Sequence, residues 1–206
     1  LKKNAIKVGA AYKEALQLQG PLQTTFDPAN PLSMQLKAVA ETIAAREDLG
    51  KRRQTFFVQM GGWDHHTGLD KHPDMLAMVS RAIGEFQAAM VELGVEDQVT
   101  TFSASDFGRT LSPNGSGTDH AWGGNQFVVG GAVDGGKIYG EYPELALGNI
   151  LDTGRGRLIP TTSVDEYAAD LALWMGVPSS DLHLVLPNLD RFHDVVVDGV
   201  PLGLML

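Results

Sequence analysis

The feature that most constrains the fold of this chain is an apolar run at residues 55–60 (Thr-Phe-Phe-Val-Gln-Met) that ends directly at two glycines. A run of aromatic and β-branched residues that stops at paired glycines is typical of a buried strand followed by a sharp turn. The turn, residues 61–66 (Gly-Gly-Trp-Asp-His-His), carries one carboxylate and two imidazoles, a donor set that suits a divalent metal. We predict that Asp64 and His66 converge on one ion. The alternative is an aspartate that caps a turn and histidines that bond to the backbone.

A second polar turn follows the next predicted strand. An apolar stripe at helical spacing predicts a helix over residues 73–93, and alternation predicts a strand over residues 98–103. Because the crossover between the two strands is a helix, the strands are expected to be parallel and to end at the same edge of the sheet. That edge would bring Asp106 beside Asp64. Asp106 is alternatively a helix N-cap, and Arg109 could neutralise it or hold an anionic substrate group with its planar fork.

A third polar turn, residues 117–123 (Gly-Thr-Asp-His-Ala-Trp-Gly), holds an adjacent acid and imidazole, Asp119 and His120. If this loop folds over the strand ends, His120 joins the ligands of the other two turns within roughly 4–5 Å of a common point, because first-shell ligands lie about 2 Å from a zinc-like ion. The alternative is a loop that an Asp–His hydrogen bond stabilises. The sequence therefore predicts one metal site built from several loops.

The rest of the pattern predicts an α/β fold. The expected helices and strands lie at residues 33–48, 73–93 and 163–175, and at 55–60, 98–103 and 125–130. Ser33 is the candidate N-cap of the first of these helices, and Ser163 and Glu166 form a capping box at the last. We predict a three-layer sandwich with a mostly parallel central sheet. The 206 residues are expected to form a single domain, with a helical extension and linker at 1–32, a core at 33–192 and a tail at 193–206.

Charge and composition exclude several classes of function. A net charge of −9 argues against a nucleic-acid or anionic-membrane surface, which needs clustered Lys and Arg. Arg155 and Arg157, in the segment Gly154-Arg-Gly-Arg157, are interpreted as part of a solvated loop, with anion binding as the alternative. No run approaches the roughly 18 apolar residues of a membrane span, and without cysteine there is no thiolate site. The chain begins at Leu1 and shows no signal peptide, so we expect a processed product or a fragment whose upstream part is not seen.

A series of motifs occurs in a fixed order. They are Gly61-Gly-Trp-Asp-x-His66, Ser105-Asp-Phe-Gly-Arg-Thr110, Asn114-Gly-Ser-Gly-Thr-Asp-His-Ala-Trp-Gly123, Gly130-Gly-Ala-Val-x-Gly-Gly136, Gly154-Arg-Gly-x-x-Ile-Pro-Thr-Thr162, Trp174-x-Gly176 and Pro187-Asn-Leu189. With these motifs the chain resembles the DUF1501 family of bacterial proteins over roughly residues 30–192. The sequence lacks the G-x-S-x-G, P-loop and G-x-G-x-x-G patterns, which disfavours a serine esterase, a P-loop NTPase and a dinucleotide enzyme.

The resemblance implies a fold and a site. DUF1501 proteins are grouped with the alkaline phosphatase and sulfatase superfamily, which has an α/β core and a two-metal site, and members commonly carry a twin-arginine export signal. By this resemblance Asp64 and His66 match the first ligand pair, Asp106 matches the aspartate of the second pair, and His120 matches a late histidine ligand. The sequence departs from the pattern at Phe107, where the superfamily usually has a histidine. The nucleophile is expected upstream of this chain.

The expected function is therefore a metal-dependent hydrolase-like domain, alkaline phosphatase-like in fold, that acts on a small phosphate or sulfate ester. Zn, or else Mn, Ca or Mg, is expected at Asp64, His66, Asp106 and His120, and Arg109 is expected to hold the anion. The resemblance places the protein in the periplasm or at the cell surface. The alternative is a non-catalytic exported domain that retains the fold as a binding or structural protein. Neither reading predicts an oligomeric state.

Overall fold

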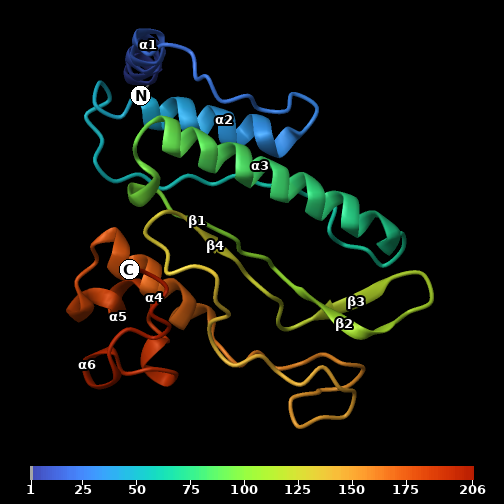
Figure 1. The fold of residues 1–206 in the computed structure, drawn as a ribbon. Coiled ribbons are helices and arrows are strands. Elements are labelled where there is room, and N and C mark those ends of the chain that lie inside the picture. The colour runs from blue at the N-terminus through green and yellow to red at the C-terminus, as the bar shows by residue number, and fades with distance from the viewer. Residues whose placement is uncertain (1) are drawn as a thin grey trace. The chain divides into compact units, whose positions relative to one another are not determined.

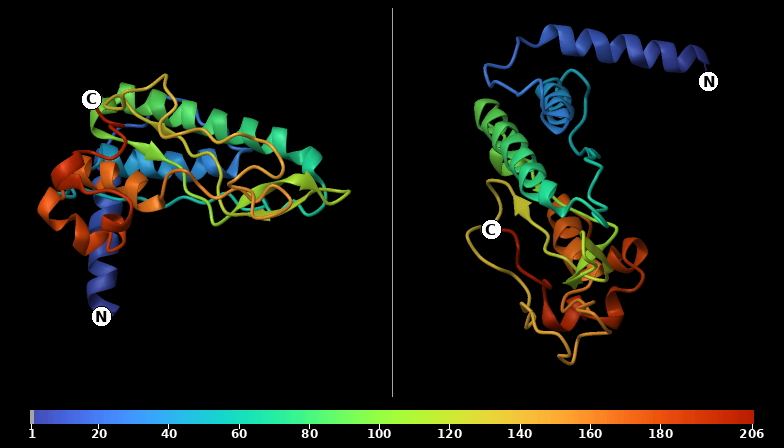
Figure 2. Two further views of the ribbon diagram at one scale, coloured as in Figure 1. Left: turned by 90° about the horizontal axis from the view of Figure 1, so that it is seen from below. Right: turned by 90° about the vertical axis from the view of Figure 1, so that its right-hand side faces the viewer.

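Helices α2 (Pro31–Ala44) and α3 (His72–Glu92) pack against each other in the computed structural model, which describes residues 2–206 (Figures 1 and 2). Their contact buries the main apolar cluster of the first half of the chain. Its members include Leu36, Ala40 and Ile43 from α2 and Phe86, Ala89 and Met90 from α3. Apolar residues at this helical spacing form one face on each helix, and burial of the two faces supplies most of the stability of such a pair.

The start of α2 is fixed by a residue that the sequence interpretation did not select. The side-chain oxygen of Asn30 accepts the Leu32 N–H at 3.1 Å, and Pro31 follows at the first helical position, where no N–H partner is required. The prediction that Ser33 is the N-cap is wrong. Ser33 instead lies fully buried one turn further along the helix.

The predicted strand at residues 55–60 does not form. The backbone of Gln59 pairs with the side chain of Gln35 on α2, whose carboxamide accepts the Gln59 N–H at 3.0 Å and donates to the Gln59 carbonyl at 2.9 Å. Val58 packs against the helical core, whereas the Phe57 side chain is 86% exposed. At residue 59 the amide of a helix glutamine thus takes the place of a strand partner, because it satisfies both backbone groups of that residue.

Two small antiparallel sheets form in the second half of the chain. Strand β1 (Thr101–Phe102) pairs with β4 (Val128–Val129), and β2 (Gly108–Pro113) pairs with β3 (Thr118–Ala121). The prediction of a three-layer sandwich with a mostly parallel central sheet is therefore wrong. It depended on a parallel crossover unit, and the 55–60 segment that should have opened that unit is not a strand. The chain between β1 and β4 instead returns through the β2–β3 hairpin.

The C-terminal part has its own apolar cluster under α4 (Val164–Met175), built from Ala169, Leu182 and Leu189. The predicted capping box opens α4, and Gly176 closes it in the left-handed conformation at φ +94°. The other helices are short or lie at the N-terminus. They are α1 (Lys2–Leu18), η1 (Leu69–Lys71), η2 (Glu96–Gln98), η3 (Ser179–Asp181), α5 (Leu182–Val185), η4 (Leu189–Arg191) and α6 (Val195–Asp198).

The chain divides into two units. The first runs to Trp63 and resumes over Asp70–Val99, and the second comprises Asp64–Leu69 and Thr100–Leu206. The single domain expected over residues 1–206 stays a prediction. In the part of the chain that the structure describes, no helix has the length and apolar character needed to cross a membrane, as the sequence predicted.

Candidate metal centre

The third polar segment, residues 117–123, is predicted as a loop, but its residues Thr118–Ala121 form strand β3 of the β2–β3 hairpin. The turn of this hairpin is built by Asn114, whose side-chain oxygen accepts the backbone N–H groups of Ser116 at 3.1 Å and Gly117 at 2.8 Å. Across the hairpin, Arg109 on β2 is the register partner of His120 on β3. Residues that face each other in an antiparallel pair have side chains close enough to act on one site.

The first polar turn docks onto this hairpin. The Thr118 N–H donates to the His65 carbonyl at 3.0 Å, and the Asn114 amide donates to the His66 carbonyl at 3.1 Å. Gly117 lies against the same turn so closely that a Cβ there would stand 2.1 Å from the His65 oxygen. The absence of a side chain at residue 117 therefore allows the two segments to meet.

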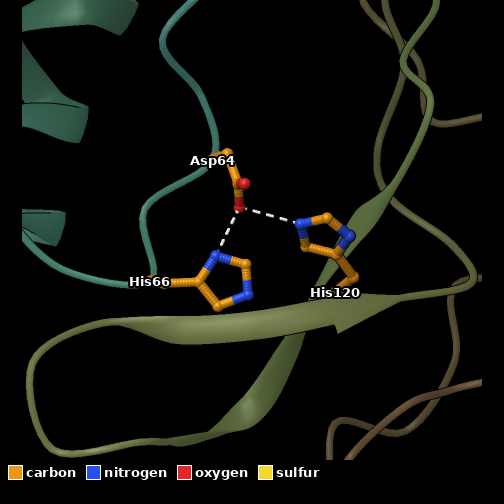
Figure 3. Close-up of side chains that lie close together, drawn as sticks. All are labelled: Asp64, His66 and His120. Atoms are coloured by element: carbon orange, nitrogen blue, oxygen red, sulfur yellow. Dashed lines mark hydrogen bonds and ion pairs between the residues drawn. The ribbon is translucent and has the colours of Figure 1, made fainter.

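Three of the four predicted metal ligands come together in this arrangement (Figure 3). Asp64 Oδ1 lies 2.7 Å from His66 Nδ1 and 2.8 Å from His120 Nε2, although Asp64 and His120 are 56 residues apart. The three residues offer one potential ligand atom each, all within 4.8 Å of one another. Their side chains are about half exposed, so the cluster is open to solvent.

The donor set fits a divalent cation. Two imidazole nitrogens and one carboxylate oxygen are the ligands of many catalytic zinc sites, which leave a fourth position open. Tetrahedral ligands about 2.0–2.1 Å from an ion stand roughly 3.3 Å apart. The distances of 2.7 and 2.8 Å to Asp64 Oδ1 are hydrogen-bond lengths, so an ion would require these pairs to separate by roughly half an ångström. Half-exposed side chains can make a movement of that size.

Arg109 contacts the carboxylate from inside the hairpin. Its Nε donates to the Thr118 hydroxyl and its Nη2 to the Thr118 carbonyl, both at 2.7 Å, and its Nη1 lies 3.4 Å from Asp64 Oδ1. The pKa of Asp64 is lowered, mostly by the hydrogen bond with His120 and further by the charges of the two histidines and the bond from Arg109, while partial burial opposes the shift. The carboxyl is therefore ionised at neutral pH, as a metal ligand must be.

Asp106 is not brought into the group. It is exposed in the bend before β2, and no helix begins there, so the alternative role as an N-cap is not realised. The next residue, Phe107, stacks on the His120 ring with centroids 3.9 Å apart and planes within 5°. Phe107 thus fixes the plane of a candidate ligand. The predicted roles of Asp106 as a ligand and of Arg109 as an anion holder stay predictions.

The sequence did not predict that Asp119 would lie beside His66. The carboxylate of Asp119 is held by residues other than its neighbour His120. Its Oδ1 instead lies 3.8 Å from His66 Nε2 and accepts from Asn114 at 3.1 Å, and its Oδ2 lies 2.5 Å from Arg155 Nη1. These contacts lower the pKa of Asp119, the Asn114 hydrogen bond most and the Arg155 contacts next. The sequence signal that could have pointed to these contacts of Asp119 is Arg155, an arginine set between Gly154 and Gly156.

Comparison with known proteins places the chain in a family. The family described as "Protein of unknown function (DUF1501)" matches residues 2–159, which is most of the chain, and the protein belongs to it. No curated protein and no solved structure matches the chain. Asp64, His66 and His120 all lie within the matched residues.

Proposed function

We propose that Asp64, His66 and His120 bind one divalent metal ion and that this centre hydrolyses a small phosphate or sulfate ester. The convergence of the three side chains carries the proposal. Asp64 and His66 share a turn, so their proximity follows from the sequence. His120 reaches the same carboxylate oxygen at 2.8 Å from 56 residues away, and the fold alone brings it there.

The surrounding residues suit this chemistry. A bound divalent ion would polarise an ester oxygen and lower the pKa of a hydroxyl or water. Phe107 holds the plane of His120 by stacking, and Arg109 Nη1 faces the Asp64 carboxylate. We propose that the positive charge of Arg109 attracts an anionic ester to the centre, in addition to its contacts with Thr118 and Asp64. The two imidazoles favour zinc over Mn, Mg or Ca, which prefer oxygen ligands.

Only the metal ligands link the proposed centre with the alkaline phosphatase and sulfatase superfamily. Phe107 stands where the superfamily has a histidine ligand, and Asp106 lies outside the group, so we propose a single-ion centre. The same two observations favour the second candidate function, a non-catalytic domain that binds metal or a partner. The family resemblance supports a location in the periplasm or at the cell surface under either function.

Metal binding is tested by calorimetric titration of the metal-free chain with Zn²⁺, Mn²⁺, Mg²⁺ and Ca²⁺, alongside thermal melts. One equivalent of ion is expected to bind, and at a hundredfold excess over Kd the folded state gains about 2.7 kcal/mol. His120→Ala should abolish this gain. His183→Ala, an exposed histidine outside the group, is the matched control and should keep it. A wild-type chain that binds none of the four ions would refute the proposal.

Hydrolysis is tested separately with p-nitrophenyl phosphate and p-nitrophenyl sulfate. The catalytic function predicts turnover by the metal-loaded wild type and its loss in Asp64→Ala at nearly unchanged metal-free stability, because Asp64 is half exposed. Metal binding without turnover of either ester would leave the non-catalytic function as the better description.

A further inference from the structure

Arg155 has a backbone conformation that its side chain disfavours. Its φ is +63°, and among residues 2–206 it is the one non-glycine residue with a positive φ. For a residue with a Cβ this left-handed conformation is uncommon, and such residues cluster at functional sites. The flanking Gly154 and Gly156 have positive φ angles that glycine adopts freely.

The loop around Arg155 is held firmly in this shape. Asp152 Oδ1 accepts the backbone N–H groups of Gly154 at 2.7 Å and Gly156 at 2.8 Å. The loop also lies along the outer edge of β2, where the Leu111 and Ser112 N–H groups donate to the carbonyls of Gly156 at 3.2 Å and Arg155 at 3.1 Å. The Arg155 backbone is therefore fixed relative to the hairpin that carries His120.

The side chain of Arg155 ends on Asp119, which in turn faces His66. Arg155 Nη1 lies 2.5 Å from Asp119 Oδ2, and Asp119 Oδ1 lies 3.8 Å from His66 Nε2. His66 therefore has a carboxylate at each ring nitrogen, with Asp64 2.7 Å from Nδ1 and Asp119 near Nε2. Histidines that bind a metal through one nitrogen usually direct the other N–H to a carboxylate, which fixes the tautomer and the ring orientation.

We infer that Arg155 and Asp119 form a positioning pair that orients His66 for metal binding through Nδ1. When Nδ1 binds the ion, the proton of His66 resides on Nε2, on the side of the ring that faces Asp119 Oδ1 at 3.8 Å, and a small shift of the ring would make that contact a hydrogen bond. Arg155 acts only through Asp119, and the amide of Asn114 holds the same carboxylate from the hairpin turn at 3.1 Å. This inference rests on the proposed metal centre. It assigns Asp119 to His66 and makes the Gly-Arg-Gly loop part of the site.

Because the Arg155 backbone is strained, a glycine substitution can distinguish a positioning role from a merely structural one. Arg155→Gly removes the guanidinium and also relieves the left-handed φ, so the metal-free protein should melt at the same temperature or higher. If the pair only ties the loop to the hairpin, metal affinity will not fall when stability is kept. If the pair positions His66, affinity falls although stability does not.

The experiment measures Zn²⁺ affinity by competition with a chromophoric chelator, together with the melting temperature of each metal-free variant. Asp119→Asn is expected to weaken binding about 10–100-fold, and Arg155→Gly about 10-fold, as for other partners of ligating histidines. Arg155→Lys keeps the charge and should retain most of the affinity. Arg157→Ala, a second arginine of the same loop, is the control and should bind as the wild type does. The Co²⁺-loaded absorption spectrum should change in Asp119→Asn and not in Arg157→Ala.

Two outcomes overturn the inference in different ways. Wild-type affinity in both Asp119→Asn and Arg155→Gly would remove the positioning pair and leave the metal centre intact. A wild-type chain that binds no Zn²⁺ would remove the metal centre and the pair together.

Discussion

Gly117→Ala probes the contact that brings the first polar turn to the β2–β3 hairpin. A Cβ at residue 117 would stand 2.1 Å from the His65 oxygen, 2.7 Å from the His66 carbonyl carbon and 2.8 Å from the His66 oxygen. All three atoms are backbone, so no side-chain rotation can relieve the clash. Gly117 is not among the glycines with positive φ, and alanine is therefore excluded by space and not by backbone conformation.

The expected cost follows from what must move. Bringing the shortest contact to an ordinary distance separates the turn from the hairpin by about 1 Å or more, at an overpacking cost of about 1–3 kcal/mol. The hydrogen bonds from Thr118 N–H to His65 and from the Asn114 amide to His66, now 3.0 and 3.1 Å, would break. At about 1 kcal/mol each they bring the loss to about 3–5 kcal/mol. For a chain of this length, that loss lowers the melting temperature by about 10 °C.

Thermal and urea unfolding of Gly117→Ala and Gly61→Ala measure this effect. Gly61 is the first residue of the same turn, but a Cβ there would meet nothing within 4 Å and its φ is not positive, so its variant should unfold close to the wild type. Zn²⁺ affinity should fall in Gly117→Ala alone, because His120 moves away from Asp64. Equal unfolding and equal metal binding by the two variants would show that Gly117 is not needed for the turn to meet the hairpin.

Two further predictions concern α4. Ser163→Ala removes the hydroxyl that accepts the Glu166 N–H at 3.1 Å and should cost about 1 kcal/mol in urea unfolding; an unchanged midpoint would show that the capping box does not stabilise the helix. Asp170, buried on α4, accepts the N–H groups of Leu202 and Leu204, and burial raises its pKa against the pull of these bonds. A group whose pKa is raised by folding contributes stability that is fully present below its pKa in the unfolded chain. That contribution is lost as the pH rises through its pKa in the folded protein. As the pH rises from about 4 to about 7, the wild type should therefore lose stability relative to Asp170→Asn, whose amide does not titrate. A gain in the stability of the wild type relative to the variant over this pH range would contradict the raised pKa of Asp170.

The sequence alone determined the three main helices, apart from the exact ends of α2, and the local half of the candidate site. The capping box at Ser163 and the stop at Gly176 are read within a few residues, because helix hydrogen bonds and caps join neighbours in the chain. Asp64 and His66 were likewise brought together by one turn. The three polar turns could be recognised because glycine, aspartate and histidine were grouped in short segments.

Only the tertiary structure decided how the strands pair and which distant residues meet. A strand needs a partner from elsewhere in the chain, and within residues 55–60 the backbone of Gln59 pairs with the amide of Gln35 on a helix. The same dependence on distant segments brought His120 to Asp64, left Asp106 outside and turned Asp119 to His66. A periodic pattern states which face of a segment is apolar, but it does not state which surface will cover that face, because that choice depends on the packing of the whole chain.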